Sequence, residues 1–173
     1  MKVLIVVDMQ HDFVDGALGS EAAKAIVPNV AAKIREYRKN GDFVLYTRDT
    51  HQANYLDTQE GRNLPVPHCI EGSEGWQILP ELEVGASPVV NKVTFGSETL
   101  PKVLKEAFPK RDMESVELIG LCTDICVISN AMVLKAFFPE VPLLVDSACC
   151  AGVSPETHKN ALEAMKVCQI QIL

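Results

Sequence analysis

Several common sequence signals are missing from this chain of 173 residues, and each absence argues against a class of protein. A positive charge balance is missing: the formal net charge is −7, so neither nucleic acid nor an anionic membrane is expected as the main partner. The apolar stretch 3–7 meets Asp8 directly and is too short for a signal peptide or a membrane span. Neither a Gly-x-Gly-x-x-Gly fingerprint nor a P-loop occurs, so no motif indicates a nucleotide.

The cysteines lack the spacings that mark a small disulfide-bonded scaffold. There are six of them, and no Cys-x-x-Cys pair occurs. We therefore expect a reduced, cytoplasmic protein. Hydrophobic residues make up 47% of the sequence, which is enough for a substantial core, and the length suits a single domain over residues 1–173.

What the sequence does contain is an alternation of strand and helix signals. Apolar and β-branched runs predict strands, and segments with Pro near the start or Gly after the end predict helices. Strands are predicted at 3–7, 43–47, 87–92, 115–121, 141–145 and 168–173. Helices are predicted at about 26–39, 99–108, 124–138 and 154–166. This order predicts an α/β fold with three α/β/α layers and a six-stranded, mostly parallel, doubly wound sheet.

Reactive side chains follow several of the predicted strands. Asp8 ends the first strand, Asp49 and His51 follow the second, Lys92 ends the third and Cys126 follows the fourth. Ligands of such sheets bind at the carboxyl ends of the strands, so we expect these side chains to face one crevice. The long polar stretch 48–75 borders the same edge, and loops of that length are usually functional.

Cys126 lies near the start of a predicted helix. There the helix dipole and free N–H groups would stabilise a thiolate, and also the oxyanion formed when it attacks a carbonyl. Asp8 can supply the base that a thiol nucleophile needs, and Lys92 the cation that keeps this base ionised. Each residue also has a purely structural interpretation. Cys126 would then be a buried thiol, Asp8 a helix cap or salt-bridge partner, and Lys92 a solvated strand end. Their meeting at one edge of the sheet favours catalysis.

A second group of residues has the composition of a metal site. Asp49 and His51 point the same way in an extended segment, and His68 lies in a stiff turn between prolines and Cys69. Two imidazoles and a carboxylate suit one divalent ion, Zn²⁺ in the first place, with Fe²⁺ or Mn²⁺ as alternatives, and Glu60 is a further candidate ligand. The alternative is a polar loop whose histidines bond to backbone groups.

Five motifs, taken together, are similar to one enzyme family. They are VVDMQHDF at 6–13, TRDTH at 47–51, PHCIEGS at 67–73, KVTF at 92–95 and GLCTDICV at 120–127. With them the chain resembles the nicotinamidase branch of the isochorismatase-like cysteine hydrolases over nearly its whole length. The resemblance implies a metal-dependent amidohydrolase of NAD metabolism that converts nicotinamide to nicotinate and ammonia through a thioester on Cys126.

The same resemblance implies roles for individual residues. It implies a catalytic triad of Asp8, Lys92 and Cys126. It implies that Asp49, His51 and His68 bind the metal, with Glu60 at a position that is a ligand in some relatives. It also implies that Phe13 and Phe95 lie on the two sides of the substrate ring. It also implies a cis peptide bond between Leu121 and Cys122, which would let the N–H groups of Cys122 and Cys126 form the oxyanion hole.

One position departs from the family pattern, and several alternatives stay open. Pro65 stands where nicotinamidases usually carry an aromatic residue, which puts the substrate in doubt more than the chemistry. Hydrolysis of another small amide or ureido compound is the nearest alternative. Two alternatives belong to another class: a redox or ligand-sensing protein that uses the pair Cys122 and Cys126 and the adjacent Cys149 and Cys150, and an inactive partner subunit. The partner we expect is a small-molecule amide, with a homo-oligomer also conceivable through Phe137 and Phe138.

Overall fold

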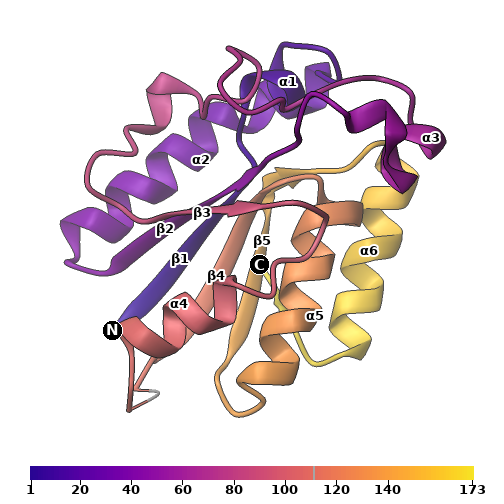
Figure 1. Cartoon of the computed structure of the whole chain (residues 1–173). Helices are drawn as coiled ribbons and strands as arrows, with labels where there is room; N and C mark the ends of the chain where they lie inside the picture. The colour runs from indigo at the N-terminus through magenta and orange to yellow at the C-terminus, as the bar shows by residue number, and fades with distance from the viewer. Residues whose placement is uncertain (111) are drawn as a thin grey trace.

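The computed structural model describes residues 1–110 and 112–173, and its strands form one six-stranded sheet (Figure 1). The strands are β1 (Lys2–Val7), β2 (Phe43–Asp49), β3 (Val89–Lys92), β4 (Ser115–Leu121), β5 (Leu143–Ala151) and β6 (Gln171–Ile172). Their order is β3-β2-β1-β4-β5-β6, and every neighbouring pair is parallel. The predicted α/β fold with a doubly wound sheet is thereby confirmed.

Helices cover both faces of the sheet. The α-helices are α1 (His11–Val14), α2 (Glu21–Lys39), α3 (Gln59–Asn63), α4 (Leu100–Ala107), α5 (Ile128–Phe137) and α6 (Pro155–Val167). Helix α2 packs on one face, and α4, α5 and α6 pack on the other (Figure 1). Among the described residues, no helix combines the length and the apolar composition that a membrane span requires.

The central strand β1 shows why its sequence is apolar throughout. Val3, Ile5 and Val7 face the core beneath α4, α5 and α6, whereas Leu4 and Val6 face the core beneath α2. Successive side chains of a strand point to opposite faces, so a strand covered on both sides needs no polar position. Burying each such side chain contributes roughly 1.5–3 kcal/mol, which anchors the strand whose end carries Asp8.

Three predicted element bounds are corrected by the structure. Helix α2 begins at Glu21 rather than near residue 26, because the Ser20 hydroxyl caps it by accepting from the Ala23 N–H, and Pro28 therefore lies inside the helix. The predicted helix 124–138 is divided into a π-helix, η3 (Thr123–Val127), and α5. Strand β5 begins at Leu143 and extends to Ala151, well past the predicted end at 145.

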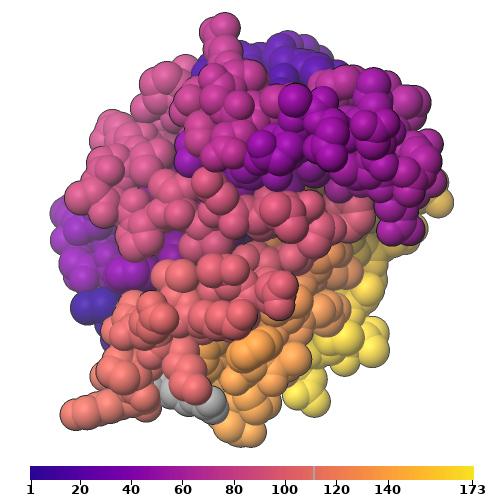
Figure 2. All heavy atoms as spheres, in the orientation of Figure 1, coloured from indigo at the N-terminus to yellow at the C-terminus, as the bar shows by residue number. Residues whose placement is uncertain are grey.

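The apolar pair offered as an interface divides between core and surface. Phe138 is buried in the core cluster, whereas Phe137 is 47% exposed. The long segment after β2 also contains more structure than expected, namely a 3₁₀ turn, η1 (Tyr55–Asp57), and helix α3. This segment and the one after β3 lie beside each other on the surface, where they line a shared hollow (Figure 2).

Candidate active site and metal centre

Asp8 stands at the carboxyl end of β1 with its side chain fully buried. Its backbone is left-handed (φ 47°), a conformation that non-glycine residues adopt at a cost of about 1–3 kcal/mol and that recurs at functional sites. The carboxylate accepts a hydrogen bond from the Thr47 hydroxyl at 2.7 Å and lies 2.6 Å from Nζ of Lys92. Burial raises the pKa of Asp8, and the charge of Lys92 works in the opposite direction.

Gly120 makes the close approach of β1 and β4 at this point sterically feasible. Its φ is 117°, and a Cβ atom there would come within 2.2 Å of the Val7 carbonyl oxygen. A residue with a side chain would therefore push apart the two strand ends that carry Asp8 and Cys126. The close packing of β1 and β4 therefore explains why the first residue of the GLCTDICV motif is a glycine.

Lys92 connects all the reactive groups at this edge of the sheet. It is 3% exposed, so it is not a solvated strand end. Besides Asp8, its Nζ lies 3.1 Å from Oδ1 of Asp49 and 3.3 Å from Sγ of Cys126, and it also donates to the Thr94 carbonyl. Burial would lower the pKa of Lys92, but Asp8, Cys126 and Asp49 raise it well above its usual value, so the ammonium form is held.

Cys126 lies in η3, directly after β4, and is 5% exposed. Burial and the negative charge of Asp8 raise the pKa of Cys126 well above that of an ordinary thiol. Desolvation and a neighbouring carboxylate both disfavour the thiolate, so the thiol carries its proton until a base removes it, and Asp8 was the base expected from the sequence.

The predicted metal ligands form one compact cluster. One ligand atom from each of Asp49, His51, Glu60 and His68 lies within 4.8 Å of the others. Nε2 of His51 lies 2.9 Å from Oδ2 of Asp49 and 3.5 Å from Oε1 of Glu60. Nε2 of His68 lies 3.7 Å from the same two oxygens.

The donor set of this cluster fits a divalent ion. Nε2 of His51 is buried and makes no hydrogen bond despite its short distance to Asp49, as expected of a nitrogen whose lone pair points at a shared centre. Nδ1 of His68 lies 2.8 Å from the Val66 carbonyl and must donate to it, which leaves the Nε2 lone pair for a metal. Cys69 is excluded from the cluster, although it is the neighbour of His68.

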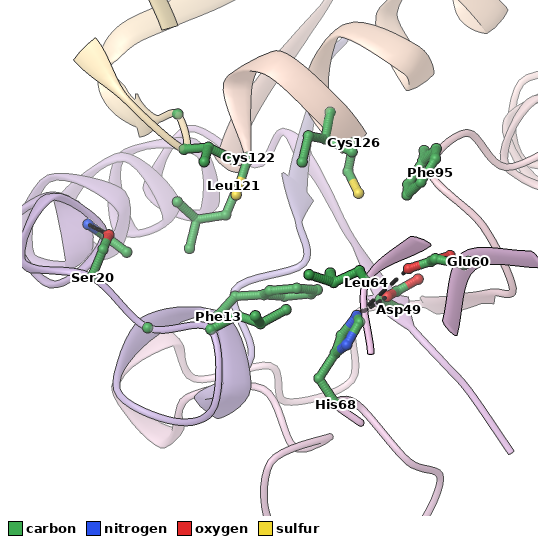
Figure 3. Close-up of a pocket in the computed structure, with 16 residues that line it drawn as sticks. Phe13, Ser20, Asp49, Glu60, Leu64, His68, Phe95, Leu121, Cys122 and Cys126 are labelled. Atoms are coloured by element: carbon green, nitrogen blue, oxygen red, sulfur yellow. Dashed lines mark hydrogen bonds and ion pairs between the residues drawn. The ribbon is translucent and has the colours of Figure 1, made fainter. Parts of the chain in front are cut away.

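A cavity of about 400 Å³ joins the nucleophile to the metal cluster. Cys126 borders it on one side and Asp49, Glu60 and His68 on another, and Phe13 and Phe95 also contribute to its walls (Figure 3). Such a volume falls within the roughly 300–1,000 Å³ typical of small-molecule sites. The structure therefore brings the predicted site residues together. Asp8, Lys92 and His51 do not line the cavity, but Lys92 contacts Asp8, Asp49 and Cys126, and His51 belongs to the metal cluster.

Pro65 is exposed and does not line the cavity, whereas its neighbour Leu64 does. An aliphatic wall thus replaces the aromatic one expected in nicotinamidases. Tyr55 packs instead against the rings of His51 and His68, with centroid distances of 4.8 and 5.0 Å. Tyr55 therefore keeps the two histidines oriented, while the cavity wall at Leu64 offers a substrate less aromatic surface.

Cys122 also lines the cavity, and the Leu121–Cys122 peptide bond is cis, as the resemblance implied. Burial raises the pKa of Cys122 to about 12, so its side chain is a neutral thiol at ordinary pH. The contribution of its main-chain N–H to an oxyanion hole stays a prediction.

Residues that orient the site were not singled out from the sequence. Gln10 is fully buried and holds Asp49 from both sides, because Oε1 accepts from the Asp49 N–H at 2.7 Å and Nε2 donates to the Asp49 carbonyl at 2.8 Å. Asp12 accepts from the Cys69 N–H at 2.7 Å and thereby fixes the turn that carries His68. Both belong to the VVDMQHDF motif, so their place in the motif was the available signal.

Comparisons with known proteins agree with this geometry. The sequence matches the isochorismatase domain family over residues 2–173. It is 26% identical to the nicotinamidase/pyrazinamidase of Mycobacterium tuberculosis, with 100% of this chain and 98% of that protein covered. The structure is similar to that of the pyrazinamidase of Pyrococcus horikoshii in complex with zinc (TM-score 0.83, 29% identity, 99% and 98% covered). It is also similar to that of N-carbamoylsarcosine amidase from Thermoplasma acidophilum (TM-score 0.82, 26% identity, 99% and 95% covered).

Proposed function

The chain belongs to the isochorismatase family, and from that premise we propose that it is an amidohydrolase of the nicotinamidase type, which converts nicotinamide to nicotinate and ammonia. One observation carries the proposal furthest. Nζ of Lys92 lies within 3.3 Å of Asp8, Asp49 and Cys126, so a nucleophile, a base and a metal-ligand cluster share one buried cation beside one cavity.

The raised pKa values of Asp8 and Cys126 define the first step. Cys126 is protonated at rest, and Asp8 is the buried carboxylate positioned to remove that proton. Lys92 offsets the negative charge that then resides on the sulfur or on the carboxylate. The thiolate attacks the carboxamide carbon, and the N–H groups of Cys122 and Cys126 hold the oxyanion, an effect typically worth about 3 kcal/mol per donor.

The remaining steps return the proton and release the acid. Asp8 gives its proton to the departing nitrogen, so the C–N bond breaks and a thioester forms on Cys126. Asp8 then takes a proton from water, which attacks the thioester. The C–S bond breaks, the acid is freed, and Asp8 returns the proton to the departing sulfur of Cys126. One buried carboxylate thus acts as base and then as acid in each half of the reaction, which suits a group whose pKa is above the usual aspartate value.

Asp49, His51 and His68, with Glu60, would hold one divalent ion, and we propose Zn²⁺. A bound ion would supply a Lewis-acid contact that orients the substrate ring, together with a bound water. The mixed nitrogen and oxygen donors support zinc, as does the zinc in the P. horikoshii pyrazinamidase structure. Phe13 and Phe95 would then cover the ring at the walls of the cavity, with Leu64 in place of a third aromatic side chain.

The redox alternative has less support from the geometry. Cys149 and Cys150 are adjacent in β5 and pack into the cores on opposite faces of the sheet, so they are not arranged as a reactive pair. All six cysteines are free thiols in the structure. A ureido substrate remains the second candidate, because the similar structures include an N-carbamoylsarcosine amidase.

An ammonia-release assay on purified, zinc-loaded protein tests the proposal. Nicotinamide and pyrazinamide should release ammonia, and N-carbamoyl amino acids should release much less at equal concentration. The Cys126→Ala variant is the control for contaminating activity. Turnover of carbamoyl compounds alone would keep the mechanism but replace the substrate, and no turnover of any amide would overturn the proposed function.

A further inference from the structure

Asn130 is a polar side chain in a place where its amide must be fully paired. It lies in α5, four residues after Cys126, and is 0% exposed. Burying an amide is costly unless its donors and acceptor are satisfied. Here Nδ2 donates to the Cys126 carbonyl at 2.8 Å and to the Phe95 carbonyl at 3.1 Å, and Oδ1 accepts from the Ser97 N–H at 2.9 Å.

The segment 93–98 has few other anchors. The side chains of Val93 and Phe95 are 79% and 43% exposed, so they add little packing. The main chain is held at Thr94 by Lys92, and at Phe95 and Ser97 by Asn130. Main-chain bonds to buried side chains therefore decide where the ring of Phe95 stands over the cavity.

The same amide also holds the nucleophile. Cys126 belongs to η3, where the Val127 N–H bonds to the Cys122 carbonyl five residues earlier, so the helix here lacks regular α-helical geometry. The bond from Asn130 to the Cys126 carbonyl ties this irregular turn to the regular turns of α5. One side chain thus connects the residue that attacks the substrate with the wall against which the substrate lies.

We infer that Asn130 is a positioning residue that fixes the spacing between the Cys126 nucleophile and the Phe95 wall. The inference rests on the proposed amidohydrolase function for its kinetic consequences, whereas the alkylation rate of Cys126 tests the position of the nucleophile without that function. Nothing in the sequence motifs points to Asn130, because it lies beyond the GLCTDICV segment and its partners come from two other places in the chain.

The test compares Asn130→Ser and Asn130→Asp with Ser97→Ala. The serine is too short to span both carbonyls, and the aspartate keeps the shape but places an acceptor where the donor was. Ser97→Ala is the matched control, because its buried hydroxyl accepts from Thr99 and Leu100 in the same segment, whereas its main-chain bond to Asn130 survives. Each variant is measured in wild-type and Phe95→Ala backgrounds for melting temperature, for the rate at which iodoacetamide alkylates Cys126, and for kcat and KM with nicotinamide.

We expect both Asn130 variants to change the alkylation rate of Cys126 at least fivefold and to lower kcat at least tenfold. They should also raise KM in the wild-type background but not when Phe95 is already Ala. The control should lower the melting temperature and leave these values near wild type. Asn130 variants whose alkylation rate, kcat and KM match those of the control would overturn the inference. If one variant fails to fold, the other decides. If wild type does not hydrolyse nicotinamide, the proposed function fails, while the alkylation rates still test Asn130.

Discussion

The nucleophile end of the cavity and its metal-ligand end lie side by side, yet they take their residues from different kinds of structure. Asp8 directly follows β1, Lys92 is the last residue of β3, and Cys126 lies in the turn after β4, so the sheet itself positions them. Of the metal ligands, His51, Glu60 and His68 come from the long segment after β2. Gln10 holds Asp49 at the end of β2. The segment after it is held by an isolated bridge between His51 and Ile70 and by Asp12, which accepts from the Cys69 N–H.

The difference matters because the two ends tolerate change unequally. At the nucleophile end, a substitution alters groups packed in the core, with negative charge that Lys92 compensates. At the metal end, a substitution alters a segment that is held by one isolated β-bridge, by individual hydrogen bonds and, when loaded, by the ion itself. Variants at each end should therefore separate chemistry from substrate binding.

The largest effect is expected from Cys126→Ala, which should reduce amide turnover by at least about 10⁴-fold, as removal of a nucleophile does in other covalent hydrolases. Cys122→Ala is the paired control and should retain most activity, because only its main-chain N–H is assigned a role. The measurement is ammonia release under saturating nicotinamide. Equal losses in the two variants would assign the chemistry to the thiol pair instead.

Lys92→Met removes the group that links the two ends and should lower kcat by about 10²–10⁴-fold. The pKa of Asp8 is already raised by burial and is held down in part by Lys92, so losing that charge raises it further. Asp8 must be ionised to accept the thiol proton, and a higher pKa keeps it protonated to higher pH. The acidic limb of the pH–rate profile should therefore move to higher pH. An unmoved limb with wild-type kcat would remove Lys92 from the mechanism.

His68→Ala should strip the bound metal and act mainly on KM, while the melting temperature of the metal-free protein changes little. The reason is that His68 extends from the segment after β2 and takes no part in the sheet. Metal content by elemental analysis, together with kcat and KM, checks the outcome. If the wild type holds no metal and keeps its activity in the presence of a chelator, the cluster is a polar loop and not a metal site.

Gln10→Leu should give the smallest effect, and it separates the orientation of a metal ligand from its presence. It leaves all four ligands in place but removes both bonds that orient Asp49, which typically costs about 10–100-fold in metal affinity. Activity should return when excess zinc is added. Asn29→Ala is the control, since it deletes one side-chain bond to the Ala148 carbonyl far from the cavity. Full activity of Gln10→Leu without added metal would contradict the orienting role.

Much of the site could be predicted because strand ends carry their chemistry in the sequence itself. Apolar runs locate β1, β2 and β4, and the residue that ends or follows each run is a candidate for the shared edge. Helix boundaries were less predictable: Pro28 looks like a first-turn residue, yet the cap at Ser20 moves the start of α2 upstream. The π-helix at Cys126 has no sequence signature, because i→i+5 pairing depends on what packs around the turn.

The sheet, the succession of strands and helices and the identity of the reactive side chains follow from the sequence, since burial pattern and residue type are local properties. The electrostatics of the site and the bonds that support it arise in the folded chain. Burial raises the pKa values of Asp8 and Cys126, and the charges of Lys92 and Asp49 that also act on both groups come from strands distant in the chain. The partners of Gln10 and Asn130 likewise lie about 35–65 residues away or across an irregular turn, and no spacing rule connects them.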